Sequence, residues 1–429
     1  MKTGDLVRIK TKKREYEGTL IPRPGLEDDT HIVLKLDNGY NIGLPKSSIV
    51  STQVLKKGAQ GHSVTGAQKK RADNKKPQVS IVSTGGTITS KVDYKTGGVF
   101  PAESAEDLVA KIPELANHAS IKSFSKPFQL LSEDMTSGEW AKIAGAVAKE
   151  LNSGAKGVIV THGTDTLHYT SAALSFMLRN LSKPVAVVGA QRSTDRGSFD
   201  GAQNLLCATH YALSDIAEVS IVMHGTSDDE YCIATRGTKV RKMHSSRRDA
   251  FRPVNDGPLA KIFPDGNIII ENTEHNARYE GKVELDDKFE EKVALIYQYP
   301  GSLPDVLDYY VSKGYKGIII AGTGFGHVAT QPLDKKKSWI PNIKSAVKKG
   351  VFVGVTTQTL YGTTDPYVYS AGRLMQDAGA VFLKDLLPET AYVKLGWVLG
   401  HKNWDVKSRM LENIAGEFNE RIDPKAFLN

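Results

Sequence analysis

Residues Val79–Thr87 read VSIVSTGGT, and residues Gly157–Thr166 read GVIVTHGTDT. Each stretch begins as a short apolar run typical of a buried strand and ends in a loop rich in glycine and threonine. Between them, apolar residues recur at helical spacing over residues 140–151, after a capping box formed by Thr136 and Glu139. This alternation of strand, loop and helix predicts an α/β fold with a mostly parallel sheet and helices on both faces.

The same alternation continues toward the C-terminus. Further short apolar runs predict strands at Val185–Val188, Ser220–Met223, Val293–Tyr297, Gly317–Ala321 and Phe352–Thr356. A polar, strongly charged stretch around Glu274–Lys292 separates the first two of these runs from the last three. We therefore expect two α/β domains, one over residues 77–285 that carries both threonine-rich loops and a smaller one over residues 286–429.

Residues 1–51 have a different texture and predict a small all-β barrel. Their short, partly alternating runs, rich in valine, isoleucine, leucine and tyrosine, are Asp5–Lys10, Tyr16–Ile21, His31–Leu36 and Tyr40–Leu44. Asp37-Asn38-Gly39 between the last two runs is a strong hairpin signal, because Asn and Gly tolerate positive φ. Residues 52–76 lack periodicity and are rich in Gly, Ser, Gln, Asn and Lys, which predicts a basic linker.

The net charge of +8 is confined to the start of the chain. Residues 1–76 hold 16 Lys and Arg against 8 Asp and Glu, whereas residues 77–429 hold 40 of each. A basic region of this kind can attract a polyanion such as RNA. The alternative, a linker whose lysines only maintain solubility, is equally compatible with a lysine run that lacks aromatic residues.

Composition excludes several classes of protein. With 40% hydrophobic and 24% charged residues, the chain is typical of a globular protein, not of a disordered or collagen-like one. Its apolar runs are far shorter than a membrane span requires, and the first residues lack the apolar segment of a secretion signal. With two cysteines and no paired histidine or cysteine ligand spacing, we expect a reduced, cytoplasmic protein without a metal.

Chemistry is expected where the strands end, because ligands of such sheets bind outside the carboxyl ends of the strands. Glycines there let the backbone approach a ligand, threonine hydroxyls offer nucleophiles, and Asp165 offers a charge to orient a base. Each feature has a plainer alternative. A Thr-Gly-Gly-Thr turn is common after strands, Asp165 could cap a helix, and His162 could be a packed core residue. Neither a Walker loop nor the G-x-G-x-x-G spacing of dinucleotide-binding folds is present.

Taken together, the two threonine-rich motifs resemble those of the L-asparaginase/glutaminase family. Four more segments fit the family pattern: Tyr94 at the position of its lid tyrosine, Ser132-Glu133-Asp134-Met135 at its substrate-binding serine, Val188–Arg192, and Lys242 at its catalytic lysine. The resemblance covers the chain from about Val79 onward. It implies a metal-free amidohydrolase with the asparaginase fold.

The resemblance assigns a role to each of these residues. A threonine hydroxyl is protonated at neutral pH and needs an activator before it can attack an amide. Lys242 would be that base, held by Asp165 beside Thr164, with Thr87 on the other side of the scissile amide. Motif order does not decide which threonine attacks first, although the family pattern favours Thr87.

The resemblance also implies the residues that surround the substrate. Backbone N–H groups around Gly86 and Gly163 would form the oxyanion hole. Tyr94, Ser132 and Glu133 would bind the substrate.

Two features are similar to the D-type subunit of archaeal glutamyl-tRNA(Gln) amidotransferases. These are the N-terminal β unit with its basic linker, and Glu133 where many plain asparaginases carry glutamine. Segments such as Gly4–Ile9, Gln358–Gly362 and Leu387–Glu389 also resemble that family. The similarity implies release of ammonia from glutamine or asparagine for a partner, the E-type subunit, which activates Glu-tRNA(Gln) and converts it to Gln-tRNA(Gln).

The same similarity implies the assembly and its cofactors. ATP and Mg²⁺ would belong to the E-type subunit, with no cofactor in this chain. A homodimeric core would give a two-plus-two heterotetramer, without contact to a membrane. Two alternatives are a stand-alone L-asparaginase with an accessory β domain and a non-catalytic RNA-associated scaffold. The intact set of Thr87, Thr164, Asp165 and Lys242 argues against the scaffold.

Overall fold

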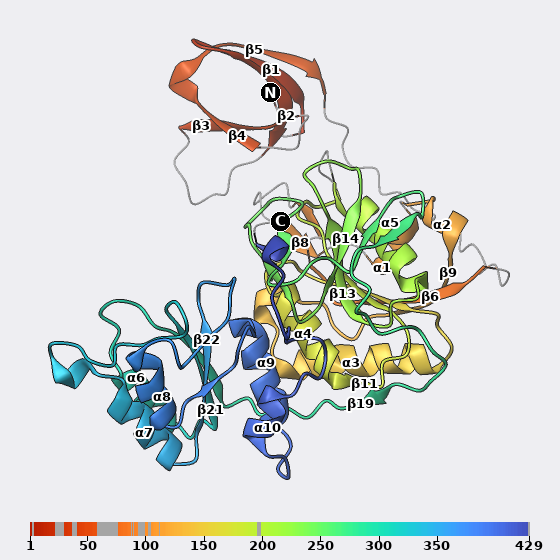
Figure 1. Ribbon diagram of the computed structural model, residues 1–429. Helices are drawn as coiled ribbons and strands as arrows, with labels where there is room; N and C mark the ends of the chain where they lie inside the picture. Colours follow the sequence, from red (N-terminus) through yellow and green to blue (C-terminus); the bar gives the residue numbers. More distant parts are fainter. Residues whose placement is uncertain are drawn as a thin grey trace.

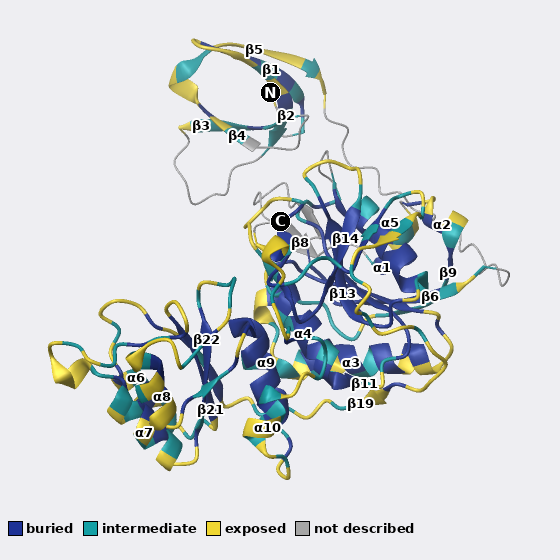
Figure 2. Ribbon diagram, viewed as in Figure 1, coloured by how far each residue is buried: buried dark blue, intermediate teal, exposed yellow. Residues whose placement is uncertain are grey.

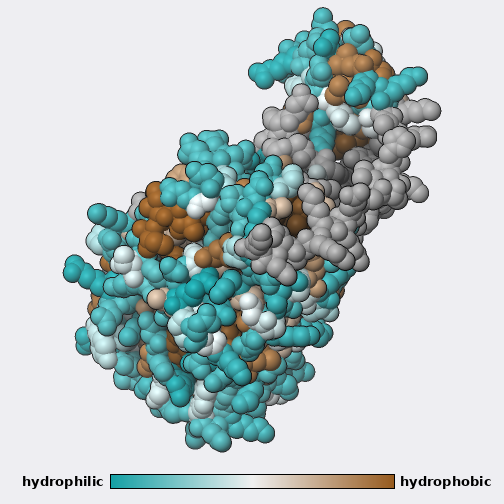
Figure 3. All heavy atoms as spheres, turned by 90° about the vertical axis from the view of Figure 1, so that its right-hand side faces the viewer, coloured by the Kyte–Doolittle hydropathy of each residue, from teal (hydrophilic) through white to brown (hydrophobic). Residues whose placement is uncertain are grey.

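The computed structural model describes residues 1, 4–21, 30–36, 41–57, 76–86, 88, 90–92, 99–101, 104–110, 112–194 and 199–427. They form a small β unit, a large α/β domain and a smaller α/β domain (Figure 1). Hydrophilic side chains predominate on the face of the molecule in Figure 3. In the part of the chain that the structure describes, no helix has the length and apolar character needed to cross a membrane.

The N-terminal unit is an antiparallel sheet whose five described strands follow the order β4-β3-β2-β1-β5. Its strands are β1 (Leu6–Thr11), β2 (Glu15–Ile21), β3 (His31–Leu36), β4 (Asn41–Pro45) and β5 (Ile49–Lys56), with η1 at Lys46–Ser48. Val7, Ile9, Leu34 and Leu44 form a core of its own. β5 continues past residue 51 because it pairs with β1 as far as Leu6↔Lys56, so the first part of the expected linker is a strand. The expected turn at residues 37–39 lies outside the described residues.

The large domain is built on a sheet whose eight described strands follow the order β18-β17-β14-β13-β12-β10-β6-β9. These strands are β6 (Gln78–Ser83), β9 (Ser120–Ser125), β10 (Val158–Thr161), β12 (Val185–Val188), β13 (Val219–His224), β14 (Cys232–Arg236), β17 (Ala260–Ile262) and β18 (Ile268–Ile270). The strands from β9 to β13 run parallel, and the last three along the edge run antiparallel. The mostly parallel sheet predicted from the sequence is confirmed.

Helices cover this sheet because its central strands are apolar on both faces. Those of the large domain are α1 (Ala105–Ala110), α2 (Leu115–His118), α3 (Ser137–Asn152), α4 (Leu167–Met177) and α5 (Gly201–Leu213), with η3 at Ser132–Asp134. The expected capping box opens α3, since the Thr136 backbone N–H donates to Glu139 Oε2 at 3.0 Å. Figure 2 shows the sheet and the inner faces of these helices buried, with exposed residues on the outside.

The smaller domain contains a parallel sheet with the order β20-β21-β22-β23 in the described residues. Its elements are β20 (Val293–Tyr297), α6 (Asp305–Ser312), β21 (Gly317–Gly322), η4 (Lys335–Lys337), α7 (Ile340–Lys348), β22 (Phe352–Thr357), α8 (Ser370–Asp377) and β23 (Val381–Phe382). Leu307, Ile318, Trp339 and Ile343 are among the residues of its separate apolar core.

The chain then returns toward the large domain. α9 (Pro388–Leu399) lies between the two α/β domains and contacts α4 on one side and β21 on the other (Figure 1). α10 (Val406–Leu411) and η5 (Pro424–Ala426) follow it. In the part of the chain that the structure describes, three strand pairs lie outside the main sheets: β7 (Ser90–Val92) with β8 (Val99–Pro101), β11 (Leu178–Arg179) with β19 (Glu284–Leu285), and β15 (Val240–Lys242) with β16 (Phe251–Pro253).

Candidate active site

The two threonine-rich loops leave neighbouring strands at the same edge of the large sheet. β6 and β10 are parallel, and their last residues, Ser83 and Thr161, lie opposite each other. The backbone N–H of Thr84 then donates to the Thr161 carbonyl at 3.1 Å. The loops that follow these strands therefore start side by side, as the strand order requires.

Glycines allow these loops to meet backbone to backbone. Gly86 has a φ of +83°, and a β-carbon on it would lie 2.3 Å from the backbone nitrogen of Gly163. A β-carbon on Gly163 would lie 2.9 Å from the side chain of Ser132. On the third loop, after β12, a β-carbon on Gly189 would lie 2.8 Å from Thr164 Cγ2. The three loops and the Ser132 turn therefore pack closely against one another at this edge of the sheet.

Lys242 reaches this site from the β15–β16 ribbon. Its amine donates to Thr164 Oγ1 at 2.9 Å and to Asp165 Oδ1 at 2.7 Å. The side chain of Lys242 is 9% exposed, whereas that of Asp165 is 66% exposed. The structure therefore brings together three residues that the sequence singled out, although Lys242 follows the other two by almost eighty positions.

This arrangement can activate an oxygen nucleophile. A lysine amine that loses its proton can accept the proton of an adjacent threonine hydroxyl, while the carboxylate of Asp165 stabilises the ammonium ion that forms. The backbone N–H groups of a loop next to the hydroxyl can stabilise an oxyanion. This geometry suits acyl transfer to an oxygen nucleophile.

Ser132 and Glu133 lie on the 3-10 turn η3 beside the Thr164 loop. The backbone carbonyl of Ser132 accepts a hydrogen bond from Thr166 Oγ1 at 2.7 Å, and Ser132 itself is buried. Ser132 Oγ lies 3.4 Å from Glu133 Oε2. Ser132 therefore borders the site. Thr87 and Tyr94 lie outside the described residues, so their roles stay predictions.

His162 supports the Thr164 loop from behind. Its Nδ1 lies 2.6 Å from the Gly163 carbonyl and its Nε2 lies 2.9 Å from the Thr170 hydroxyl. Since a carbonyl oxygen only accepts, Nδ1 carries the proton and Nε2 accepts from Thr170. Complete burial lowers the pKa of His162 to about 4. His162 is therefore a packed core residue, as the plainer interpretation of the sequence had it.

Gln191 lies in the segment Val188–Arg192, which was noted in the sequence only for its family pattern, and Gln191 was not predicted as a site residue. It follows β12, and its Oε1 lies 3.5 Å from Thr164 Oγ1. Its Nε2 is buried without a protein partner in the described residues. The signal that could have identified Gln191 is its position just after the carboxyl end of β12, because the loops after β6 and β10 lie at the same edge of the sheet.

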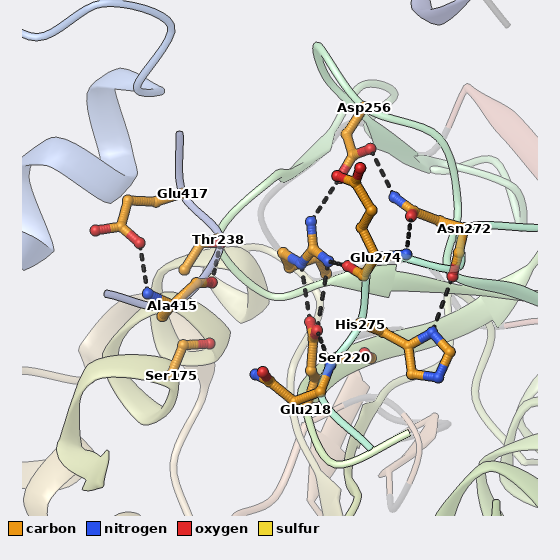
Figure 4. A network of polar contacts seen from close by, with 12 residues as sticks. Ser175, Glu218, Ser220, Thr238, Asp256, Asn272, Glu274, His275, Ala415 and Glu417 are labelled. Atoms are coloured by element: carbon orange, nitrogen blue, oxygen red, sulfur yellow. Dashed lines mark hydrogen bonds and ion pairs between the residues drawn. The ribbon is translucent and has the colours of Figure 1, made fainter. Parts of the chain in front are cut away.

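Groups of three or more His, Cys, Asp or Glu side chains arranged to hold a metal ion are absent from the described residues. A polar pocket of about 440 Å³ lies elsewhere, and Glu218 and Arg236 are among its lining residues. Arg236 is held there by Glu218, Asp256 and the Glu274 carbonyl (Figure 4). Glu218 precedes β13, so this network lies at the opposite ends of the strands from Thr164.

The sheet order and the Thr164, Asp165 and Lys242 set define a protein of the asparaginase class. Three family models match the chain: the N-terminal domain of asparaginase over residues 78–276, the C-terminal domain of glutaminase/asparaginase over residues 292–409, and the GatD N-terminal domain over residues 1–55.

Solved structures of two L-asparaginases share the fold. The thermostable L-asparaginase from Thermococcus kodakarensis superposes with a TM-score of 0.71 at 27% identity, over 80% of this chain and 100% of that one. L-asparaginase I from Vibrio cholerae superposes with a TM-score of 0.66 at 28% identity, over 80% of this chain and 99% of that one. The asparaginase-like fold expected from the sequence is confirmed.

Relatives that match the whole chain, including the N-terminal β unit, are named as amidotransferase subunits and not as asparaginases. The D-type subunit of the glutamyl-tRNA(Gln) amidotransferase of Pyrococcus furiosus is 50% identical over 100% of this chain and 97% of its own length. The same subunit of Methanothermobacter thermautotrophicus is 47% identical over 97% of this chain and 94% of its own length. The chain therefore belongs to the family of glutamyl-tRNA(Gln) amidotransferase D-type subunits, and the resemblance noted in its sequence is confirmed.

Proposed function

We propose that this chain is the glutaminase subunit of a tRNA-dependent amidotransferase, which releases ammonia from glutamine or asparagine. The observation that carries the proposal is the position of Lys242, whose amine lies within 2.9 Å of Thr164 Oγ1 and 2.7 Å of Asp165 Oδ1. The names of the relatives and the GatD-type N-terminal unit support the assignment to an amidotransferase.

The proposed reaction has two halves. In the first, a threonine oxygen attacks the side-chain amide carbon of the substrate, and the C–N bond breaks once the nitrogen has gained a proton. Ammonia leaves, and an ester joins the acyl group to the enzyme. In the second half, water attacks that ester, which releases glutamate or aspartate and returns the proton to the threonine.

Thr87 is proposed as the acyl-forming residue. Thr164, Asp165 and Lys242 would then manage the protons of both half-reactions. Backbone N–H groups near Gly86 and Gly163 would stabilise the oxyanion, and Tyr94, Ser132 and Glu133 would bind the substrate.

The ammonia would pass to a partner, the E-type subunit of the amidotransferase. That partner would use ATP and Mg²⁺ to phosphorylate the glutamyl group of Glu-tRNA(Gln), and ammonia would displace the phosphate to give Gln-tRNA(Gln). The complex is proposed as a cytoplasmic two-plus-two heterotetramer around a homodimer of this chain. No cofactor is proposed for the chain itself.

Reconstitution with the partner tests this proposal. The chain and the E-type subunit, supplied with glutamine, ATP, Mg²⁺ and Glu-tRNA(Gln), should form Gln-tRNA(Gln), and omission of this chain should leave that product dependent on added ammonium. Formation of the product from glutamine without this chain would contradict the proposal. Rapid asparagine hydrolysis by the isolated chain, unaffected by the partner, would instead favour a stand-alone L-asparaginase.

A further inference from the structure

The strand that carries Lys242 is too short to fix its own position. Among the described strands β15 pairs with β16 alone, through Val240↔Pro253 and Lys242↔Phe251 at its two ends. A two-stranded ribbon is at best marginally stable in water when it stands alone. The place of the Lys242 amine therefore depends on what packs against the ribbon.

A buried ion pair fixes the start of the ribbon. Lys239, which directly precedes β15, pairs with Asp385, and both side chains are almost completely excluded from solvent. Burial lowers the pKa of Lys239, an effect that the charge of Asp385 opposes. Asp385 also accepts the backbone N–H of Asn419. Removal of either partner would leave an unpaired charge in the interior, which is strongly destabilising.

A second ion pair lies one residue before Lys242. Arg241 Nη1 lies 3.0 Å from Glu389 Oε1, in the first turn of α9, and the Glu389 side chain is 5% exposed. Neither Arg241 Nη1 nor Glu389 Oε2 has a hydrogen-bond partner in the described residues, so the two side chains interact through their charges. Burial raises the pKa of Glu389, and the charge of Arg241 opposes that shift. This carboxylate is therefore buried with Arg241 as its main compensation.

The same helix and the C-terminal segment hold the residue before Lys239. Thr390 Oγ1 donates to the Thr238 carbonyl at 3.0 Å, and Thr238 Oγ1 donates to the Ala415 carbonyl at 3.0 Å. Figure 4 shows Thr238 beside Ala415, whose N–H donates to Glu417. Glu417 pairs with Lys394 of α9, so the segment is tied to the same helix.

Strand geometry connects these contacts to the active site. Successive side chains of a strand point to opposite faces. Lys239 and Arg241 share one face and meet Asp385 and Glu389, while Lys242 reaches Thr164 from the other. A shift of the ribbon away from α9 would therefore move the Lys242 amine relative to Thr164 Oγ1.

We infer that Asp385 and Glu389 are positioning residues, which hold the β15 ribbon through Lys239 and Arg241 so that Lys242 meets Thr164 and Asp165. The inference rests on the proposed function. According to this inference α9, which lies between the two α/β domains, positions the strand β15 that carries the proposed base, Lys242.

Glu389→Gln is the sharper test because it removes charge while keeping size. Glu150→Gln is the matched control, since Glu150 is a comparably buried carboxylate on α3 that accepts a hydrogen bond from Ser80, near the start of β6 and so at the opposite edge of the sheet from Thr164. We expect kcat for ammonia release to fall about ten- to a hundredfold in Glu389→Gln, with KM for glutamine within about twofold, because a misplaced base slows chemistry more than binding. The control should keep wild-type kcat.

A second readout does not depend on activity. Trace labelling of amines with acetic anhydride, followed by mass spectrometry, should show Lys242 labelled faster in Glu389→Gln than in the wild type, with Lys142 as an internal reference. Folded Glu389→Gln with wild-type kcat and wild-type labelling of Lys242 would overturn the inference, as would equal losses in Glu150→Gln. Absence of ammonia release from the wild type would instead count against the proposed function. If Glu389→Gln fails to fold, the double variant Arg241→Met/Glu389→Met, which leaves no unpaired charge in the interior, carries the same measurements of kcat, KM and labelling.

Discussion

Gly86 and Gly163, which belong to loops of different strands, pack so closely that a β-carbon on Gly86 would lie 2.3 Å from the nitrogen of Gly163. Both glycines belong to the loops proposed to supply the oxyanion hole. The contact sets how near the Thr87 loop comes to the Thr164 loop, so it links two motifs of the proposed reaction.

Gly86→Ala should therefore destabilise the protein and abolish ammonia release. The positive φ and the backbone clash together should cost about 2–5 kcal/mol in the free energy of unfolding. Gly154→Ala is the control, because Gly154 also has positive φ, +101°, but open space around its β-carbon position. It should cost only about 1–2 kcal/mol and retain activity. Urea unfolding and an ammonia assay check both; equal costs would refute the close-contact argument.

Thr164→Val, Asp165→Asn and Lys242→Met should each reduce ammonia release by several orders of magnitude, and Thr87→Val should do the same. The residues act as one unit, so the double variant Thr164→Val/Lys242→Met should lose little more than either single variant. Lys142→Met, at an exposed lysine of α3, should retain wild-type kcat. Any one of the four single variants that keeps more than about a tenth of the wild-type rate would disprove its assigned role.

The stability of the protein should fall between pH 6.5 and pH 4 in part because of His162. Burial lowers the pKa of His162 from 6.5 to about 4 in the folded state. In that window the unfolded chain binds the proton and the folded chain does not, so acid favours unfolding by up to about 1.4 kcal/mol per pH unit.

His162→Gln should flatten this pH dependence, measured as the free energy of urea unfolding at pH 5 and pH 7. Thr170→Val is the control, because it removes the hydroxyl on His162 Nε2 but leaves the imidazole. The control should keep the wild-type slope. An unchanged slope in His162→Gln would contradict the burial argument.

Deletion of residues 1–76 should leave ammonia release intact while weakening the coupling to the E-type subunit. The N-terminal unit has its own core of Val7, Ile9, Leu34 and Leu44, separate from the cores of both α/β domains, so their packing does not depend on it. Binding to the E-type subunit and formation of Gln-tRNA(Gln) measure the coupling. A deleted protein that bound the partner and made the product at the full rate would show that the unit is not a docking element.

Replacement of Lys69, Lys70, Arg71, Lys75 and Lys76 by Gln should have a smaller effect. Contacts between lysines and phosphates are electrostatic and weaken with salt. The effect on use of Glu-tRNA(Gln) should therefore shrink as salt rises. An effect independent of salt would indicate a structural role for the linker.

Features governed by local sequence could be predicted, and features set by distant partners could not. Val185–Val188 was predicted as a strand because four consecutive apolar residues suit a strand buried on both faces, and β12 has these bounds. The loops after β6 and β10 were predicted as the site because parallel strands end at one edge. Thr164, Asp165 and Lys242 came from family resemblance, and their contact required the fold.

Lys239 shows why the rest could not be foreseen. A lysine in a polar segment is normally exposed, and nothing nearby in the sequence reveals that Asp385, 146 positions later, compensates its charge. The exposed strand at Thr52–Lys56 was interpreted as linker for a similar reason. It lacks an alternating pattern, and only pairing with β1 makes it a strand.

The separation of Lys239 and Asp385 also has a consequence for the time course of synthesis. A ribosome that adds about 5–20 residues per second completes residues 239–385 in about 7–29 seconds. During that interval the strands of the large sheet are completed, while α9, whose Leu395 and Trp397 belong to the same apolar core, and the carboxylates that hold the Lys242 ribbon are still missing. The growing polypeptide should therefore acquire its sheet early and its ability to hydrolyse amides late, once α9 has been made.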